Sequence, residues 1–120
     1  MPGMDNDVIA GLRGLIGPYA KELRWKNDGP AGFYADTLKD DAKGKPEFFA
    51  SAQVRKNAVS FYLMPVYCYP ELLDGISPEL KKRMQGKSCF NFKEVEPKLF
   101  AELRGLIEKG YVRYREAGRI

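Results

Sequence analysis

The sequence predicts an α+β domain in which an antiparallel sheet of about four to five strands packs against N- and C-terminal helices. Amphipathic helical patterns lie near both ends of the chain, and short runs with strand-like alternation lie between them. Glycine and proline residues separate these runs. The 120 residues, of which 44% are hydrophobic and 30% charged, are enough for one core, so we expect a single domain over residues 1–120.

The first helical pattern covers residues 8–23, where apolar side chains recur every three or four positions. One of the polar residues 5–7 can cap its start. Gly17-Pro18 interrupts the pattern, because the proline ring has no amide hydrogen and disfavours helical geometry at the preceding residue. We therefore expect a kink, or a new helical segment with Pro18 in its first turn.

The middle of the chain predicts strands. One strand is expected over residues 32–37, and the polar run KDDAKGKP, residues 39–46, predicts an exposed loop after it. Residues 47–54 and 57–64 predict a hairpin whose turn contains Arg55-Lys56.

Aromatic residues are concentrated in the run FYLMPVYCYP, residues 61–70. Because side chains alternate along a strand, one face should carry Val59, Phe61 and Leu63, and the other Ser60, Tyr62 and Met64. Aromatic side chains of a central hairpin usually pack in the core. We favour that interpretation over a ligand pocket or base-stacking surface formed by Tyr62 and Tyr67.

Start signals predict the remaining helices. Ser77-Pro78-Glu79 combines a side-chain cap, a first-turn proline and an acid near the positive end of the helix dipole, which predicts a helix that reaches Gln85 and stops at Gly86. The run SCFNFK, residues 88–93, predicts a strand. Glu96-Pro97 then opens a last helix with an apolar stripe of Leu99, Phe100, Leu103, Leu106, Ile107, Tyr111 and Tyr114.

Gly86-Lys87-Ser88 matches the end of a phosphate-binding loop only in part. Such a loop needs a glycine five positions before Gly86 and leads from a strand into a helix. Position 81 is lysine, and here the predicted helix precedes the motif and the predicted strand follows it. We interpret Gly86 as a helix terminator in the left-handed conformation.

Residues 81–93 form a basic region around this motif. Its cations are Lys81, Lys82, Arg83, Lys87 and Lys93, and Ser88 adds a hydroxyl. They can hold a phosphate or a carboxylate, or they can be the solvated end of a helix, where cations are favoured by the dipole. The solvated helix end is the preferred interpretation, since charged runs on helices usually face solvent.

The composition excludes several kinds of site. The chain has no histidine, which removes the usual zinc sites and the Ser-His-Asp and Cys-His arrangements. A Ser-Lys or Tyr-Lys pair remains, but no spacing identifies one, so we do not expect an enzyme. Cys68 and Cys89 lie in apolar surroundings and are expected to be buried free thiols.

Charged residues give few further indications. Asp36, Asp40 and Asp41 are weak candidates for metal ligands, although a solvated loop explains them better. The net charge of +4 and the pI of about 9.1 favour anionic partners, but the excess is too small to indicate a dedicated nucleic-acid module. The sequence has no signal peptide pattern and no apolar run of about 20 residues, so we expect no membrane association and a cytoplasmic location.

The motifs SFYLMPVY, residues 60–67, and PELLDGISPELKKRMQGKSCFNFK, residues 70–93, resemble the YdhG-like family, domain of unknown function 1801. The resemblance extends over most of the chain, including GPYAKELRW after the first helix and LFAELRGLIEKGYVRYREAG in the last. It implies a frataxin-like layout with terminal helices against an antiparallel sheet. Some relatives are described as iron-binding chaperones that deliver iron for haem or iron–sulfur assembly.

Two functions therefore remain open at this point. The resemblance implies a non-enzymatic YdhG-like binding module that handles iron through carboxylates or acts on a partner protein, with no cofactor assigned. The alternative is recognition of an anionic ligand or nucleic acid by residues 81–93, with Tyr62 or Tyr67 nearby, which would depend strongly on salt.

Overall fold

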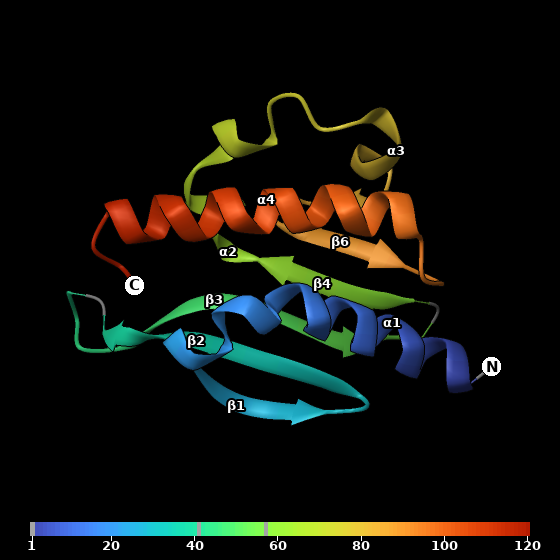
Figure 1. Cartoon of the computed structure of the whole chain (residues 1–120), viewed down its shortest axis with the longest axis horizontal. Coiled ribbons are helices and arrows are strands. Elements are labelled where there is room, and N and C mark those ends of the chain that lie inside the picture. Colours follow the sequence, from blue (N-terminus) through green and yellow to red (C-terminus); the bar gives the residue numbers. More distant parts are fainter. Residues whose placement is uncertain (1, 41, 57) are drawn as a thin grey trace.

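The computed structural model describes residues 2–40, 42–56 and 58–120, and it confirms the α+β class. In chain order the elements are α1 (Pro2–Ile16), the 3₁₀ helix η1 (Gly17–Glu22), β1 (Leu23–Gly29), β2 (Gly32–Asp40), β3 (Pro46–Val54), β4 (Val59–Leu63), α2 (Met64–Cys68), the 3₁₀ helix η2 (Pro70–Leu73), α3 (Pro78–Lys81), β5 (Met84–Gln85), β6 (Cys89–Phe92) and α4 (Pro97–Glu116). Within the described ranges the strands form one six-stranded antiparallel sheet in the order β1-β2-β3-β4-β6-β5 (Figure 1).

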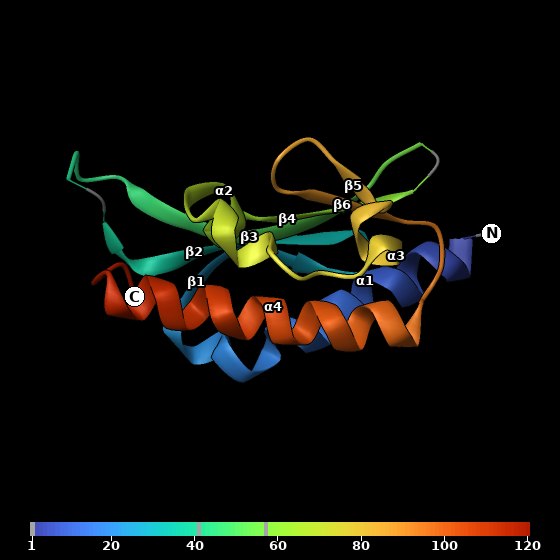
Figure 2. The same ribbon diagram turned by 90° about the horizontal axis from the view of Figure 1, so that it is seen from above.

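The two long helices lie on the same face of this sheet. Figure 2 shows α1 and α4 together on one side of the strands, and neither of them covers the opposite side. The segment from α2 to α3 packs along α4. We call the sheet face opposite α1 and α4 the open face.

Alternation in β4 and β6 separates the core from the open face, as the sequence predicted for residues 59–63 of β4, whereas Met64, predicted on the outward face of this strand, is the first residue of α2. Val59, Phe61 and Leu63 are fully buried toward the helices, and Phe90 on β6 lies opposite Phe61. Ser60 points the other way. The predicted stripe of α4 is also confirmed, since all seven of its residues are buried.

The first helical pattern ends earlier than residue 23. The α-helix stops at Ile16, and η1 starts at Gly17 with Pro18 in its first turn, which confirms the predicted new segment. Leu23 is buried as the first residue of β1, a strand that was not predicted. Most residues of β1 are polar and exposed, and a register shift between Trp25 and Asn27 breaks the alternation, so the usual strand pattern is missing.

The prediction that the helix starting at Pro78 reaches Gln85 is wrong. Ser77 caps α3 as expected, its hydroxyl accepting from the Leu80 amide, but the helix ends at Lys81. Met84 and Gln85 instead pair with β6 as the short edge strand β5. Gly86 does have a positive φ of 81°, but it lies in the turn between β5 and β6 and not at a helix end.

Two other predictions need correction. The strand predicted over 32–37 continues to Asp40, so only part of the predicted loop is loop. Cys89 is buried as expected, whereas Cys68 is only half-buried. The Cys68 Sγ accepts from Arg119 Nη1 at 3.2 Å, and both cysteines are free.

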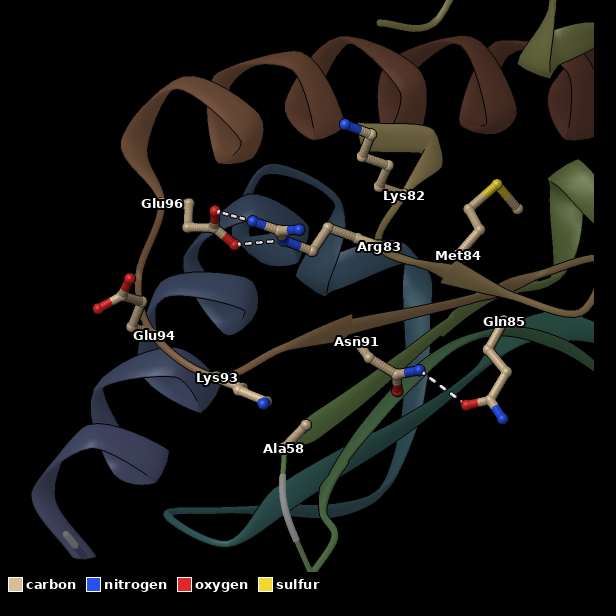
Figure 3. A pocket seen from close by; sticks show the side chains of 9 residues that line it. All are labelled: Ala58, Lys82, Arg83, Met84, Gln85, Asn91, Lys93, Glu94 and Glu96. Atoms are coloured by element: carbon tan, nitrogen blue, oxygen red, sulfur yellow. Dashed lines mark hydrogen bonds and ion pairs between the residues drawn. The ribbon is translucent and has the colours of Figure 1, made fainter. Parts of the chain in front are cut away.

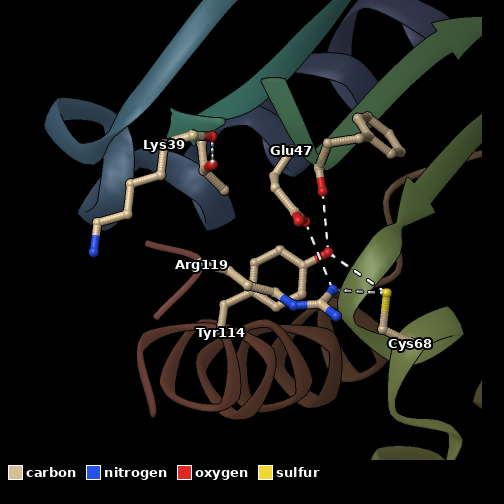
Figure 4. A network of polar contacts seen from close by, with 7 residues as sticks. Lys39, Glu47, Cys68, Tyr114 and Arg119 are labelled. Atoms are coloured by element: carbon tan, nitrogen blue, oxygen red, sulfur yellow. Dashed lines mark hydrogen bonds and ion pairs between the residues drawn. The ribbon is translucent and has the colours of Figure 1, made fainter. Parts of the chain in front are cut away.

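The C-terminal end of α4 is attached to β3 and α2 by a polar network (Figure 4). The Tyr114 hydroxyl donates to the Phe48 carbonyl at 3.1 Å, and Arg119 lies 3.6 Å from Glu47 and also contacts Cys68. Burial raises the pKa of the Tyr114 hydroxyl far above its ordinary value. Tyr114 therefore stays protonated and able to donate at physiological pH.

The core assignment of α4 predicts that Leu103→Ala will destabilise the protein by about 2 to 5 kcal/mol, because Leu103 is fully buried and its truncation leaves a cavity. Chemical denaturation measures this change. Val112→Ala on the same helix is the control, since Val112 is 46% exposed and should change stability by less than about 0.5 kcal/mol. Equal losses in the two variants would contradict the assignment.

Two glycines of α4 should respond in opposite directions to alanine. A Cβ at Gly110 would lie 2.7 Å from Pro65 Cβ, so Gly110→Ala should destabilise the protein by about 1 to 3 kcal/mol through overpacking of α4 on α2. A Cβ at Gly105 meets no atom within 4 Å, so Gly105→Ala should stabilise by up to about 1 kcal/mol through helix propensity. The midpoint of urea denaturation reports both, and stabilisation by Gly110→Ala would contradict the close packing.

Candidate anion-binding site

A hollow of about 600 Å³ lies on the open face, over β4, β5 and β6. Three of its described lining residues, Arg55, Lys56 and Lys93, are cations. No carboxylate is found among the described lining residues. The others are neutral: Ala58, Ser60, Tyr62, Gln85, Cys89 and Asn91. We call this surface the basic hollow.

Hydrogen bonds centred on Asn91 hold the floor of the basic hollow. The Asn91 side-chain oxygen accepts from the Ser60 hydroxyl at 2.7 Å and from the Cys89 thiol at 3.7 Å. Its amide nitrogen donates to Gln85 Oε1 at 3.0 Å. Because these side chains come from the paired strands β4, β6 and β5, the sheet register fixes their positions. The remaining amide hydrogens of Asn91 and Gln85 are donors at fixed positions.

Arg55 and Tyr62 form one side of the basic hollow. The Arg55 Nη2 donates to the Tyr62 hydroxyl at 3.4 Å, which directs the guanidinium back over β4. The Arg55 backbone amide donates to the Ala58 carbonyl at 2.7 Å and so shapes the turn between β3 and β4. None of the ion pairs between described residues involves Arg55, Lys56 or Lys93. No acid lines the hollow with these three cations, although Glu94 follows Lys93 in the sequence, so their mutual repulsion is only partly offset.

A second recess adjoins the basic hollow on the side of α3. It has a volume of about 540 Å³, and its lining includes Lys82, Arg83, Lys93, Glu94 and Glu96 (Figure 3). Arg83 makes a bidentate pair with Glu96, with Nε–Oε2 and Nη2–Oε1 distances of 2.8 and 2.6 Å. This pair neutralises Arg83 and connects the end of α3 to the start of α4. Lys93 lines both surfaces.

The structure brings only some of the predicted site residues together. Tyr62 and Lys93 line the basic hollow, and Lys82 lines the adjoining recess. Lys87 and Ser88 lie in the turn between β5 and β6 and line neither surface, because the predicted helix before them is replaced by a hairpin. Tyr67 is on α2, is 53% exposed and also lines neither surface.

Arg55 and Lys56 are site residues that the sequence reasoning missed. The sequence predicts them only as residues of a hairpin turn, where basic residues are uncommon compared with Asn-Gly. Their charge in that position, together with Ser60 and Tyr62 on the outward face of the next strand, was the available signal. Asn91 could be placed beside them only once the pairing of β4 with β6 was known.

The predicted carboxylate group is separated by ion pairs. Asp36 is buried on β2, and its Oδ2 lies 3.1 Å from Lys26 Nζ. Asp40 lies 3.7 Å from Arg24 Nη1, and Asp41 is outside the described residues. Asp36 therefore lies in a strand, and the prediction of a solvated loop is wrong for this residue. Over the described ranges, no group of three or more histidine, cysteine, aspartate or glutamate side chains is arranged to hold a metal ion.

Comparison of the chain with protein-family models, curated proteins and solved structures found no match. The resemblance to the YdhG-like family therefore stays a prediction. Among the described helices, none combines the length and apolar character that crossing a membrane requires.

The Arg83–Glu96 pair predicts an acid-dependent loss of stability. Its hydrogen bonds hold the Glu96 pKa below the ordinary value of 4.5, so the pair contributes fully above that pH and is lost as the pH falls through the lower folded-state pKa. Glu96→Gln should therefore lower the free energy of unfolding by about 0.5 to 1 kcal/mol at neutral pH and by less once Glu96 is protonated. Denaturation across acidic pH tests this, with Glu116→Gln as the matched control, because it removes the same charge from an exposed position outside the Arg83–Glu96 pair.

Proposed function

We propose that this protein is a non-enzymatic binding module that holds a phosphate-bearing anion in the basic hollow. The observation that carries the proposal is the convergence of Arg55, Lys56 and Lys93 on one surface without a carboxylate. A bound anion relieves the repulsion among these cations, so binding is favoured electrostatically. The fixed amides of Asn91 and Gln85 add hydrogen bonds that orient the ligand.

The same geometry supports a phosphate more than an isolated carboxylate. Three cations and two amides approach the hollow from the β3–β4 turn, β6 and β5, so an anion with oxygens on several sides can satisfy more of them at once. The hydroxyl of Tyr62 accepts from Arg55 and keeps that guanidinium over the sheet. A carboxylate has only two oxygens in one plane, so some of these cations and amides would stay hydrogen-bonded to water.

The iron-handling function rests on the resemblance alone and is not the one we propose. An iron surface needs clustered carboxylate oxygens when histidine is absent. Asp36 and Asp40 are instead paired with Lys26 and Arg24.

We also place the proposed function in the cytoplasm, because both cysteines are free thiols, which persist in reducing compartments.

Titration with inorganic tripolyphosphate at two salt concentrations tests the proposal. We expect saturable binding that weakens with added salt. Lys56→Ala combined with Lys93→Ala should weaken it by about tenfold or more, since charge-assisted hydrogen bonds are worth ~1.5 to 3 kcal/mol each. Lys21→Ala combined with Lys109→Ala is the matched control, because it removes the same charge from η1 and α4, away from the basic hollow.

Two results would contradict the proposal. One is an equal loss of tripolyphosphate affinity in the two double variants, which would indicate attraction by net charge only. The other is tight, stoichiometric binding of ferrous iron in anaerobic calorimetry, which would favour the iron-handling function. We expect iron to bind more weakly than micromolar and to be unaffected by Lys87→Ala.

A further inference from the structure

A row of side chains crosses the open face beyond the basic hollow. The strand register places Tyr34 opposite Ser51, Ser51 opposite Tyr62, and Tyr62 opposite Cys89. Since neighbouring strands are about 4.8 Å apart, the two tyrosines are attached about 10 Å apart on either side of Ser51. Ser51 is only 5% exposed although neither long helix covers this face, so its neighbours on the open face shield it.

Tyr34 is held in place on both sides. Its ring stacks on Phe48 with centroids 4.8 Å apart and an interplanar angle of 28°. The Lys26 Nζ lies 5.0 Å from the Tyr34 centroid and 3.1 Å from the buried Asp36 carboxylate. Lys26 lies over the ring, but its side chain is 54% exposed, so a base can take its place against Tyr34. Aromatic rings are the surfaces on which unpaired bases stack in proteins that bind single strands.

A second hollow of about 470 Å³ opens beside Tyr34, and its lining includes Asn27, Ser51 and Gln53. Gln53 lies opposite Ser60, which lines the basic hollow on the next strand. The two hollows are therefore about one strand spacing apart on the same face. Amide side chains such as Asn27 and Gln53 can donate to and accept from the edges of bases.

We infer that the open face binds single-stranded nucleic acid, with phosphates at the basic hollow and bases against Tyr62 and the Tyr34–Phe48 pair. This inference rests on the proposed function and names its ligand. Charge complementarity supports it, because no carboxylate is found among the described residues that line the basic hollow. Of the acids closer to Tyr34, Asp36 is paired with Lys26, and Asp28, which lines the second hollow, is paired with Arg13. The net charge of +4 acts in the same direction at long range.

The shape of the surface selects a single strand. Pockets for small ligands enclose most of the ligand, whereas these two hollows are open and spread over neighbouring strands. The major groove of a duplex admits a helix or a two-stranded ribbon, and a six-stranded sheet is too wide for it. In a duplex the base faces are also stacked and out of reach of Tyr34 and Tyr62.

Fluorescence anisotropy with labelled single-stranded DNA and RNA of about ten nucleotides tests the inference. Tyr62→Leu and Tyr34→Leu should each weaken oligonucleotide binding by about fivefold or more, because a stacked base is lost. Tyr67→Leu, on α2 and outside both hollows, should leave it unchanged. Polyphosphate of equal charge should bind Tyr34→Leu and Tyr67→Leu within about twofold of the wild type, whereas Tyr62→Leu also removes the hydroxyl that positions Arg55. Circular dichroism checks that each variant is folded.

Salt dependence gives a measurement that does not rely on the tyrosine variants. The logarithm of oligonucleotide affinity should fall with the logarithm of salt concentration, and Lys93→Ala should reduce the slope by about 0.7. DNA and RNA bound equally would point to recognition of bases and phosphates, and tighter RNA binding to additional contacts with the 2′-hydroxyl. Both results support the inference.

Several outcomes would overturn it. If folded Tyr62→Leu and Tyr34→Leu proteins bind the oligonucleotide as the wild type does, or if a duplex or a poly-glutamate peptide of equal charge binds as tightly, the open face does not recognise single strands. In those cases binding of polyphosphate would leave the proposed function intact. Failure of both polyphosphate and oligonucleotide to bind would reject the two proposals together.

Discussion

The helices α1 and α4 cover only one face of the sheet, and the composition of every strand depends on this one-sided coverage. The two helices pack against each other, with Gly11 so close to Phe100 that a Cβ there would lie 2.8 Å from its ring. Apolar side chains such as Phe61 and Phe90 must therefore point to the helices, and the alternate positions of the same strands face outward. The residues of the open face do not pack in the core between sheet and helices, so core packing does not dictate their identity.

The open face still buries polar groups without a covering layer. Ser60 and Asp36 are 6% and 1% exposed, so their neighbours on the sheet screen them from water. Ser60 is satisfied by Asn91. The Asp36 Oδ2 lacks a hydrogen bond of good geometry but lies 3.1 Å from Lys26 Nζ, and a buried carboxylate is tolerated when a cation pairs with it. Asp36 thereby holds Lys26 beside the Tyr34 ring, so the burial of one acid positions a cation on the proposed ligand surface.

The sequence was informative where one periodicity continued over many residues. The stripe of α4 and the alternation of β4 could be predicted because burial on one side repeats without interruption. The strand β1 was missed because its irregular register near Trp25 and its polar residues hide the pattern, and β5 was missed because Met84 and Gln85 are too few to show one. Tyr62 and Lys93 were found from residue type alone. Their partner Arg55 required the hairpin geometry.

The distribution of charge on the sheet is the reason why we propose anion binding over iron handling, the two functions that the sequence left open. At the edge formed by β1 and β2, acids and cations alternate in ion pairs, as with Asp40 and Arg24, and such pairs leave little field for either a metal ion or an anion. Toward β6 the cations Lys56 and Lys93 have no acid among the residues that line their hollow with them. Because no acid is among the described residues that line the basic hollow, its cations are less compensated than those of the β1–β2 edge, and this difference is the basis for proposing that a phosphate binds there.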